Sequence, residues 1–429
     1  MRRSEVIKIR TNVMSKRKDF WSSLGIVLAI AGICCMGIVK GLLDTNLRIL
    51  STLIVILSVV FLAKGSKLGY IEMPTEDAGC VFAYGILTLV LAFCSGIPLM
   101  TNPYGFIFQA AAFMQLFMLW NIDFDSDPDY YVEIGFWLCG VFCLIALVLL
   151  LKKTGGALFA PDILSEDGEY LFSRATIGEI GFKTFVLVLA YQPQTYWKTM
   201  ARRAFLIVAI TVLIASTRRG FYMGAIITCV IHYRNCRKNS DVIDVDRTIK
   251  RALSVLFCMV LLLVLYSNIS FIRDAFERAI DVFINGILTF LGLENSDVSA
   301  SMRTSSAKRV IDQYLYNSTA MQVLFGRGYM TTWVDVPIVQ AFWDLGSFGG
   351  IFFAVIQFII PARYLAKKAE SQGMRAAQYL TAMSMLEGIM SGYPYGGSFS
   401  CILLIKIHTA HELEERRKET RQKRVGNQV

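Results

Sequence analysis

Hydrophobic blocks of about 20 residues recur along this chain of 429 residues, and they constrain its fold more than any other feature. Each block is long enough to cross the ~30 Å hydrocarbon core of a bilayer as a helix that rises 1.5 Å per residue. Hydrophobic residues make up 55% of the sequence, above the roughly 45–50% of soluble domains. A transmembrane β-barrel would show short alternating segments instead. The sequence therefore predicts an all-α polytopic membrane protein.

These blocks predict about twelve transmembrane helices. The expected spans are 20–40, 47–63, 79–100, 103–120, 132–151, 177–192, 204–216, 219–233, 252–268, 345–362, 376–392 and 398–411. The chain then divides into a basic N-terminus (1–19), nine spans (20–268), a large loop (269–344), three spans (345–411) and a basic tail (412–429).

The distribution of lysine and arginine orients this topology, because cytoplasmic loops are enriched in both residues. The two strongly basic termini are expected in the cytoplasm, together with the basic loops at 193–203, 234–251 and 363–375. The loop NIDFDSDPDYY at 121–131 is an exception, since it would lie inside and yet holds only acidic charges. The net charge of +10 follows from these loops, so no nucleic-acid partner is predicted.

The loop over 269–344 is a long polar segment that lies outside the membrane in this topology. Its first part, 272–291, has apolar residues at helical spacing. This pattern predicts an amphipathic helix, which either lies on the outer membrane surface or packs against the protein itself. Ser305 and Ser306 are expected to cap a second helix over 307–322.

Three groups of basic residues lie on the outer side of this topology, against the positive-inside rule. They are Arg174 before the sixth span, Arg218 and Arg219 in the turn STRRG, and Arg303, Lys308, Arg309 and Arg327 in the large loop. A lipid-borne diphosphate explains them, because arginine binds phosphate bidentately and stays charged. Pairing with lipid headgroups or nearby acids is the alternative. The expected diphosphate-binding residues are Arg174, Arg218 and Arg219, with Arg309 and Arg327 as second choices.

Catalysis by histidine or by a metal ion is not predicted on the outer side. His232, His408 and His411 all fall on the cytoplasmic side of this topology, which argues against a hydrolytic triad or a zinc site outside. The ten cysteines show no disulfide framework and no metal-ligand spacing. No glycine-rich phosphate loop stands between a strand and a helix. We therefore expect no metal and no cofactor.

Four stretches in the second half of the chain have the order and spacing of known family motifs. They are SRATIG, with Arg174; STRRGFYMGAII, with Arg218 and Arg219; AKRVIDQYLYNSTAMQVLFGRGY; and WVDVPIVQAFWDLGSFGGIFFAV. Over residues 165–365 the chain thereby resembles the O-antigen polymerase/ligase superfamily, the Wzy and WaaL type of membrane glycosyltransferase. The stretches are similar to its Arg-Gly segment, its Ser-Arg-x-Arg-Gly turn, its Gly-x-Gly and its Leu-Gly-x-x-Gly.

The resemblance implies a metal-independent glycosyltransferase in the bacterial plasma membrane. A glycan on a polyprenyl diphosphate would be transferred, at the outer leaflet, to a hydroxyl of an incoming lipid-linked repeat unit. The product would be a capsule, exopolysaccharide or O-antigen, and the partners a flippase and a chain-length regulator of the same pathway. Ligases of the family have a His-Asn pair where this chain reads Val334-Asp335-Val336, so the polymerase branch is favoured.

Such a transfer needs a group that takes the proton of the attacking hydroxyl and groups that neutralise the leaving diphosphate. Asp335 is the candidate general base and Asp344 the alternative. Asp335 has a second interpretation, as the N-cap of a helix that begins near Pro337. Three aromatic residues are candidates for stacking on sugar rings, or for simple anchoring at the membrane interface: Tyr329, Trp333 and Trp343.

A ligase and a lipid-linked oligosaccharide flippase are the alternative functions. A flippase would place cations around a central cavity within the spans. In the predicted spans the main interior cations are Lys183 and Lys406, whereas the arginine groups gather at one face. This distribution favours the enzyme.

Overall fold

The computed structural model describes most of the second half of the chain and parts of the first. The described residues are 20–32, 38, 48–65, 128–155, 174–216, 218–236, scattered positions between 266 and 288, 298–328, 331–390, and six positions between 401 and 408. Every regular element among them is a helix. Three of these helices are long and apolar enough to cross a membrane: Asp129–Lys153, Tyr196–Ser216 and Pro337–Ala366. The all-α class is thus confirmed.

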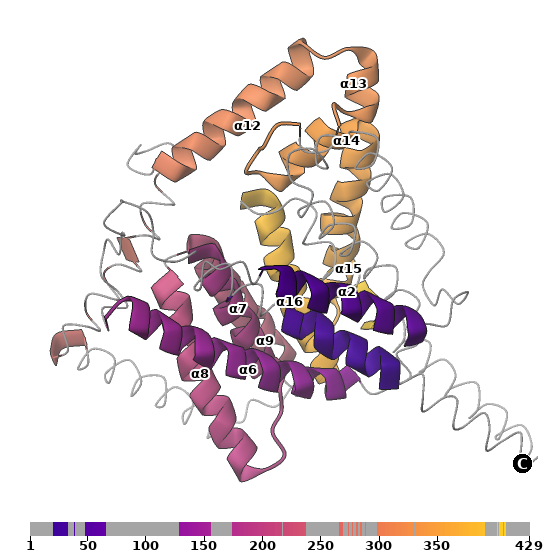
Figure 1. Ribbon diagram of the computed structural model, residues 1–429. Helices are drawn as coiled ribbons and strands as arrows, with labels where there is room; N and C mark the ends of the chain where they lie inside the picture. The colour runs from indigo at the N-terminus through magenta and orange to yellow at the C-terminus, as the bar shows by residue number, and fades with distance from the viewer. Residues whose placement is uncertain are drawn as a thin grey trace, which may run out of the picture.

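A bundle of helices forms the body of the protein (Figure 1). Its members are α6 (Pro128–Lys153), α7 (Arg174–Ala190), α8 (Tyr196–Ser216), α9 (Arg219–Cys236) and α16 (Gln372–Met390). α7 packs against all the others. The helix Phe20–Gly32 and α2 (Arg48–Gly65) lie beside α6. The predicted spans at 79–100 and 103–120, and most of 252–268 and 398–411, lie outside the described residues.

Small residues let these helices approach closely, as is typical of helix packing in membranes. Gly140 of α6 lies against the ring of Phe205 on α8, and Gly224 of α9 lies against Met383 of α16. Rings fill the space between helices, and Phe136 stacks on Tyr191 with centroids 4.4 Å apart. A Cβ on Gly140 would overlap the Phe205 ring, and a Cβ on Gly224 would require the Met383 side chain to move.

Hydrogen bonds fix the direction of the helices and define two ends of the bundle. Asn235, at the end of α9, donates to Gln378 near the start of α16 (2.8 Å), so α9 and α16 are antiparallel. We call the end that holds Asn235 the basal end. α6 also begins there, because the amide of Gly373 donates to Asp129 (3.0 Å) and Lys198 binds Glu133 (2.5 Å).

These contacts account for Asp129, the described acidic residue of the loop that departs from the positive-inside rule, and for the nearby Glu133. Asp129 and Glu133 stand at the basal end among the basic residues of the predicted inner loops. Asp129 accepts from a backbone amide in the first turn of α16, where the helix dipole favours negative charge. Glu133 pairs with one of the lysines of that end. Acidic side chains there stabilise the ends of other helices.

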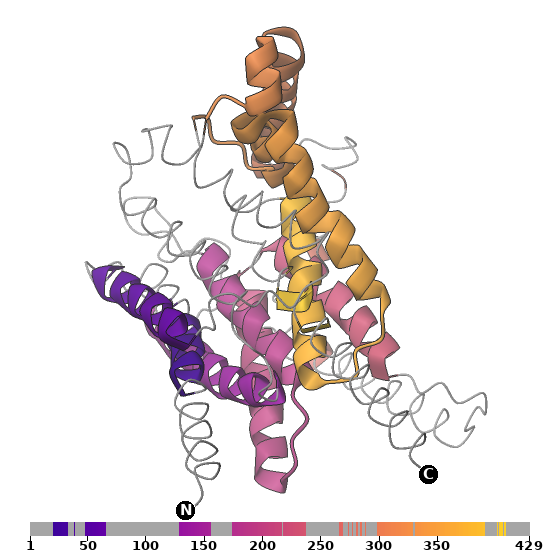
Figure 2. The ribbon, with the colours of Figure 1, turned by 90° about the vertical axis from the view of Figure 1, so that its right-hand side faces the viewer.

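The other end of the bundle, the cap end, is extended by one long helical rod. The rod consists of α14 (Pro337–Ala354), the π-helix η2 (Val355–Ile359) and α15 (Ile360–Ala366). The predicted span began at residue 345, but α14 begins eight residues earlier at Pro337, where the second interpretation of Asp335 placed a helix start. Gly346 bends the helix with φ of 66°. The first part of α14 therefore crosses the end of the bundle before the rod turns along it (Figures 1 and 2).

A compact cap stands on this rod. It contains α12 (Val298–Tyr316), α13 (Ala320–Phe325) and the segment 331–345. Its small core is formed by Val310, Val334 and Trp343. Figure 2 shows the cap projecting beyond the bundle.

Two expectations for the cap were wrong. Ser305 and Ser306 do not begin a helix but lie inside α12, where they donate to the carbonyls of Met302 (3.0 Å) and Arg303 (2.9 Å). A hydroxyl that bonds back within the helix is the other common role of serine. Asp335 is not an N-cap either, because the N-cap of α14 is Val336.

The described part of the predicted amphipathic segment is helical at Arg273, Glu277, Ile280, Asp281 and Ile284. Ile280 is 40% exposed and Ile284 is 47% exposed. Leu288, one turn further along, is helical and half-buried, and the charged residues Arg273, Glu277 and Asp281 are exposed like the two isoleucines.

A backbone crossing at Gly326 and Gly346 joins the cap to the rod. The bend at Gly346 frees the carbonyls of Trp343 and Asp344 from their usual partners in the helix. The amides of Arg327 and Gly328 donate to these two carbonyls at 3.0 and 3.1 Å. Buried carbonyls are costly without partners, so the crossing stabilises both the bend and the loop.

Neither glycine of the crossing leaves room for a side chain. Gly326 has φ of 83°, in the left-handed region that other residues avoid. A Cβ on Gly326 would overlap the carbonyl of Asp344, and a Cβ on Gly346 would overlap the backbone of Leu324 and Gly326.

We expect Gly326→Ala to loosen the cap by about 1–3 kcal/mol, through overpacking and strain at positive φ. The measurement is the rate of tryptic cleavage after Arg327 in the detergent-solubilised protein, together with its Tm. Gly220→Ala is the matched control, because no atom lies within 4 Å of a Cβ there. Equal cleavage rates in both variants would contradict the crossing.

Candidate functional site

The arginines predicted to bind diphosphate start helices at the cap end. Arg174 is the first residue of α7 and Arg219 the first residue of α9, with Arg218 just before it. Gly178 lies against Ser216 and Phe221. The start of α7 therefore borders the turn from α8 to α9.

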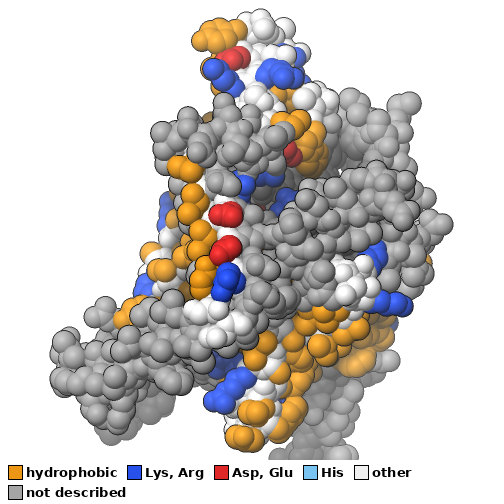
Figure 3. All heavy atoms as spheres, turned by 90° about the vertical axis from the view of Figure 1, so that its left-hand side faces the viewer, with side chains coloured by type: hydrophobic (Ala, Val, Ile, Leu, Met, Phe, Trp, Pro, Cys, Tyr) orange, Lys and Arg blue, Asp and Glu red, His pale blue; other side chains and the backbone are white. Residues whose placement is uncertain are grey.

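The cap stands at the same end as these arginines. Gln357 of the rod donates to the carbonyl of Ser384 in α16 (2.6 Å), and Tyr364 accepts at its carbonyl from Gln378. The rod therefore runs antiparallel to α16, and its earlier residues lie beyond the cap end of the bundle. On the face in Figure 3, charged side chains stand at the top, on the cap side, and further down as well, and hydrophobic side chains form much of the described surface at the bottom.

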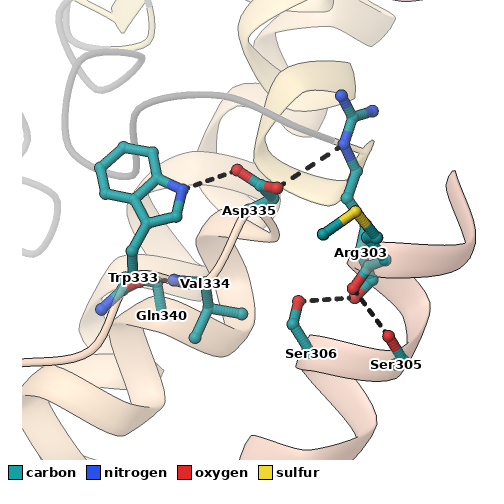
Figure 4. A network of polar contacts seen from close by, with 8 residues as sticks. Arg303, Ser305, Ser306, Trp333, Val334, Asp335 and Gln340 are labelled. Atoms are coloured by element: carbon teal, nitrogen blue, oxygen red, sulfur yellow. Dashed lines mark hydrogen bonds and ion pairs between the residues drawn. The ribbon is translucent and has the colours of Figure 1, made fainter. Parts of the chain in front are cut away.

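Asp335 lies between an indole and a guanidinium. Trp333 Nε1 donates to Asp335 Oδ1 at 2.6 Å, and Arg303 Nε lies 3.9 Å from Asp335 Oδ2. Figure 4 shows Trp333 and Arg303 on opposite sides of the carboxylate, the first from the loop before α14 and the second from α12. The Asp335 side chain is 45% exposed, so a ligand can reach its oxygens.

The local sequence explains how this group is held. In an extended segment, alternate side chains point to opposite faces, and Val334 is buried between the exposed Trp333 and the half-exposed Asp335. Gln340 fixes the segment: it accepts from the Val334 amide (2.5 Å) and donates to the Thr332 carbonyl (2.8 Å). The buried side-chain amide of Gln340 thus holds the backbone from which Trp333 and Asp335 project.

Asp344, the alternative base, has a different environment. Its side chain is fully buried and accepts from Gln340 Nε2 at 2.7 Å. Its carbonyl accepts from the Gly328 amide at the crossing. A carboxylate enclosed in this way supports the segment that holds Asp335, and it does not face an incoming ligand.

The two tryptophans differ in the same way. Trp333 is 52% exposed, whereas Trp343 is 4% exposed. The guanidinium of Arg327 lies over the Trp343 ring, 4.4 Å from its centroid. Trp343 therefore packs the core of the cap, and only Trp333 of this pair offers a stacking surface. Tyr329 lies outside the described residues.

The second-choice arginines make other contacts. Arg327 donates to the Asn317 carbonyl at the end of α12 (3.0 Å) and to Ser318 (3.1 Å), a structural use of its charge. Arg309 is exposed on α12, where it lines a shallow cavity of about 390 Å³ with Lys308 and Asp312.

Several residues of the site could not be assigned from the sequence. Arg303 was one of several cations in the loop. The sequence around it contains no signal that would pair it with Asp335, which lies on another segment. In the sequence, Gln340 is a polar residue in an apolar helix.

Glu387, a residue of α16 in the bundle, was also missed; it lies within electrostatic range of the Glu179–Lys183 pair of α7. The charge of Glu387 in an apolar helix was the available signal for it.

Among the described residues, no group of three histidine, cysteine, aspartate or glutamate side chains is placed to hold a metal ion. No protein-family model matches the sequence, and searches among curated proteins and solved structures give no match.

Proposed function

We propose that the protein polymerises lipid-linked oligosaccharide repeat units at the outer face of a bacterial plasma membrane. The proposal includes twelve spans with both termini in the cytoplasm, and a metal-independent transfer that needs no cofactor. The product is a surface polysaccharide, such as a capsule, exopolysaccharide or O-antigen. The supporting observation is that Asp335, held between Trp333 and Arg303, stands at the same end of the bundle as Arg174, Arg218 and Arg219.

In the proposed reaction, the bond between the anomeric carbon of the donor glycan and its diphosphate breaks. An acceptor hydroxyl forms the new glycosidic bond, and its proton passes to Asp335 and then to solvent. A general base must come within hydrogen-bonding reach of that proton. Asp335 meets this need better than Asp344, because its carboxylate is half exposed whereas Asp344 is enclosed.

The arginines at the starts of α7 and α9 would bind the diphosphate of the donor. Fixed guanidinium groups stabilise the charge that develops on the leaving oxygen, without the reorganisation that water requires. Helix N-termini add favourable dipoles for an anion at this end. Trp333 would stack on the acceptor sugar next to the base.

A flippase is retained as a second candidate because of one observation. Glu387 lies within electrostatic range of the Glu179–Lys183 pair on α7, and charges at membrane depth are usually functional. A ligase is the third candidate. A gel of lipid-linked glycans from a deletion strain separates them: single repeat units on lipid indicate a polymerase, and full-length polymer on lipid a ligase. Repeat units trapped on the cytoplasmic face would indicate a flippase.

Asp335→Asn should abolish long chains, because the amide cannot accept the proton. Loss of a general base costs roughly 10²–10⁴ in rate. The measurement is the glycan ladder of a complemented deletion strain with equal membrane levels of the protein. Asp281→Asn, an exposed residue of the same loop, should leave the ladder unchanged. A normal ladder from Asp335→Asn would refute the assignment of the base.

Arg219→Ala should reduce the rate by roughly 10²–10³, the usual effect of removing one electrostatic stabiliser. Purified protein with lipid-linked repeat units is the appropriate assay. Arg203→Ala is the control, since Arg203 is exposed on α8 towards the basal end. If both variants lose the same activity, the effect does not arise from a diphosphate site at the cap end.

Trp333→Phe and Trp333→Ala should separate two roles of one side chain. Phenylalanine keeps a stacking surface but loses the hydrogen bond to Asp335, and a bond to a charged group contributes about 1.5–3 kcal/mol. We therefore expect Trp333→Phe to lower kcat, and Trp333→Ala to lower kcat and also raise KM for the acceptor. Identical kinetics of the two variants would show that the ring makes no sugar contact.

A further inference from the structure

The short helix α13 presents an apolar surface that the proposed reaction does not use. Its sequence, AMQVLF, contains no charge. Met321 is 65% exposed, Leu324 41% and Phe325 46%. The helix is fixed in place, because Thr319 and Gln322 form a reciprocal capping box at its start. These exposed side chains therefore belong to an ordered surface.

This surface is continuous with the membrane-facing side of the rod. The ring of Phe325 stacks on Phe348 of α14, with centroids 5.7 Å apart and planes 26° apart. Phe348 is 51% exposed, and Ile351 and Ile359 further along the rod are 55% and 51% exposed. The rod has the length and apolarity of a membrane span, so these exposed residues are the ones that would meet lipid.

The depth of α13 follows from the length of the rod. About 20 residues separate the bend at Gly346 from the end of α15 at Ala366, and a helix of that length crosses about 30 Å, the thickness of the hydrocarbon core. The bend therefore lies near the edge of the hydrocarbon. α13 packs against the start of this segment, at the level where headgroups meet acyl chains.

We propose that α13 is a membrane-contact element whose apolar edge, Met321, Leu324 and Phe325, is immersed in the lipid interface of the leaflet that the cap faces. The partner is the bilayer itself, at the boundary between headgroups and acyl chains. Short apolar helix edges bind there by removing apolar area from water. Because the crossing at Gly326 and Gly346 ties α13 to the rod, this contact sets the height of the cap above the membrane.

The test uses the full-length protein in phosphatidylcholine and phosphatidylglycerol vesicles. One phospholipid carries a diazirine on its acyl chain close to the headgroup. After irradiation, trypsin cleavage at Arg309 and Arg327 releases the peptide 310–327, and mass spectrometry locates the lipid adducts. We expect adducts on Met321, Leu324 and Phe325, with few at Gln313 and Asn317 in the same peptide.

A matched pair of variants separates lipid contact from misfolding. Met321→Glu should lower labelling of the peptide several-fold, whereas Met321→Leu should keep it. Lipid adducts absent from α13, or strong labelling of α13 by a water-soluble diazirine, would overturn the proposal. Crosslinks from α13 to a second copy of the chain or to another protein, in place of lipid adducts, would overturn it as well. The result does not depend on the reaction, because no substrate is present.

Discussion

The crossing of two backbones at Gly326 and Gly346 is the contact on which the cap depends. A helix that bends sharply loses hydrogen bonds, and here the amides of Arg327 and Gly328 replace them. The carbonyl of Val323 accepts from Tyr314 (2.7 Å) and from Ser347 (3.0 Å), so the end of α13 is bonded to α12 and to the rod. These bonds place the segment that holds Asp335 on a rigid support, which a site for group transfer requires.

Charge is organised differently at the two ends of the bundle. At the basal end, acidic and basic side chains pair with one another and with helix ends, as Glu133 does with Lys198. At the cap end, arginines begin helices and Arg303 approaches Asp335 without a hydrogen bond from its Nε. The basal end therefore pairs Glu133 with Lys198, while at the cap end Arg303 stands beside a half-exposed carboxylate.

Much of the fold could be predicted from the sequence, because hydrophobic length is read directly from it. α6, α9 and α16 begin and end within four residues of their expected spans, whereas α8 begins eight residues before its span. The errors concern positions where a tertiary contact overrides a local signal. The predicted span at residue 345 left out the first part of α14, where Gln340 binds the buried carboxylate of Asp344. Ser305 and Ser306 resembled caps, and only the continuation of α12 on both sides reveals otherwise.

The candidate site was predicted in part. Trp333, Asp335 and the arginines were proposed from residue type, order and the family resemblance, and their roles stay predictions. The pairing of Arg303 with Asp335 depends on the packing of α12 against α14 through Val310 and Trp343. Exposure separates Trp333 from Trp343 and Asp335 from Asp344, and exposure is a property of the fold. The pattern of a single sequence does not show which of two neighbouring residues of the same type is exposed.

The π-helix η2 has a consequence for how the two ends communicate. A π-turn accommodates one residue more than an α-turn, and each residue of an α-helix advances about 100° around the axis. The extra residue therefore changes the angle about the helix axis between the parts of the rod before and after η2. Gln357, within η2, donates hydrogen bonds to the carbonyl and the hydroxyl of Ser384 on α16. This turn therefore sets the rotation of the cap about the rod axis relative to Tyr364, which contacts the basal part of α16. If the turn reverted to α-geometry, the cap would rotate as a unit above the bundle, and Asp335 would face a different direction while every contact within the cap survived.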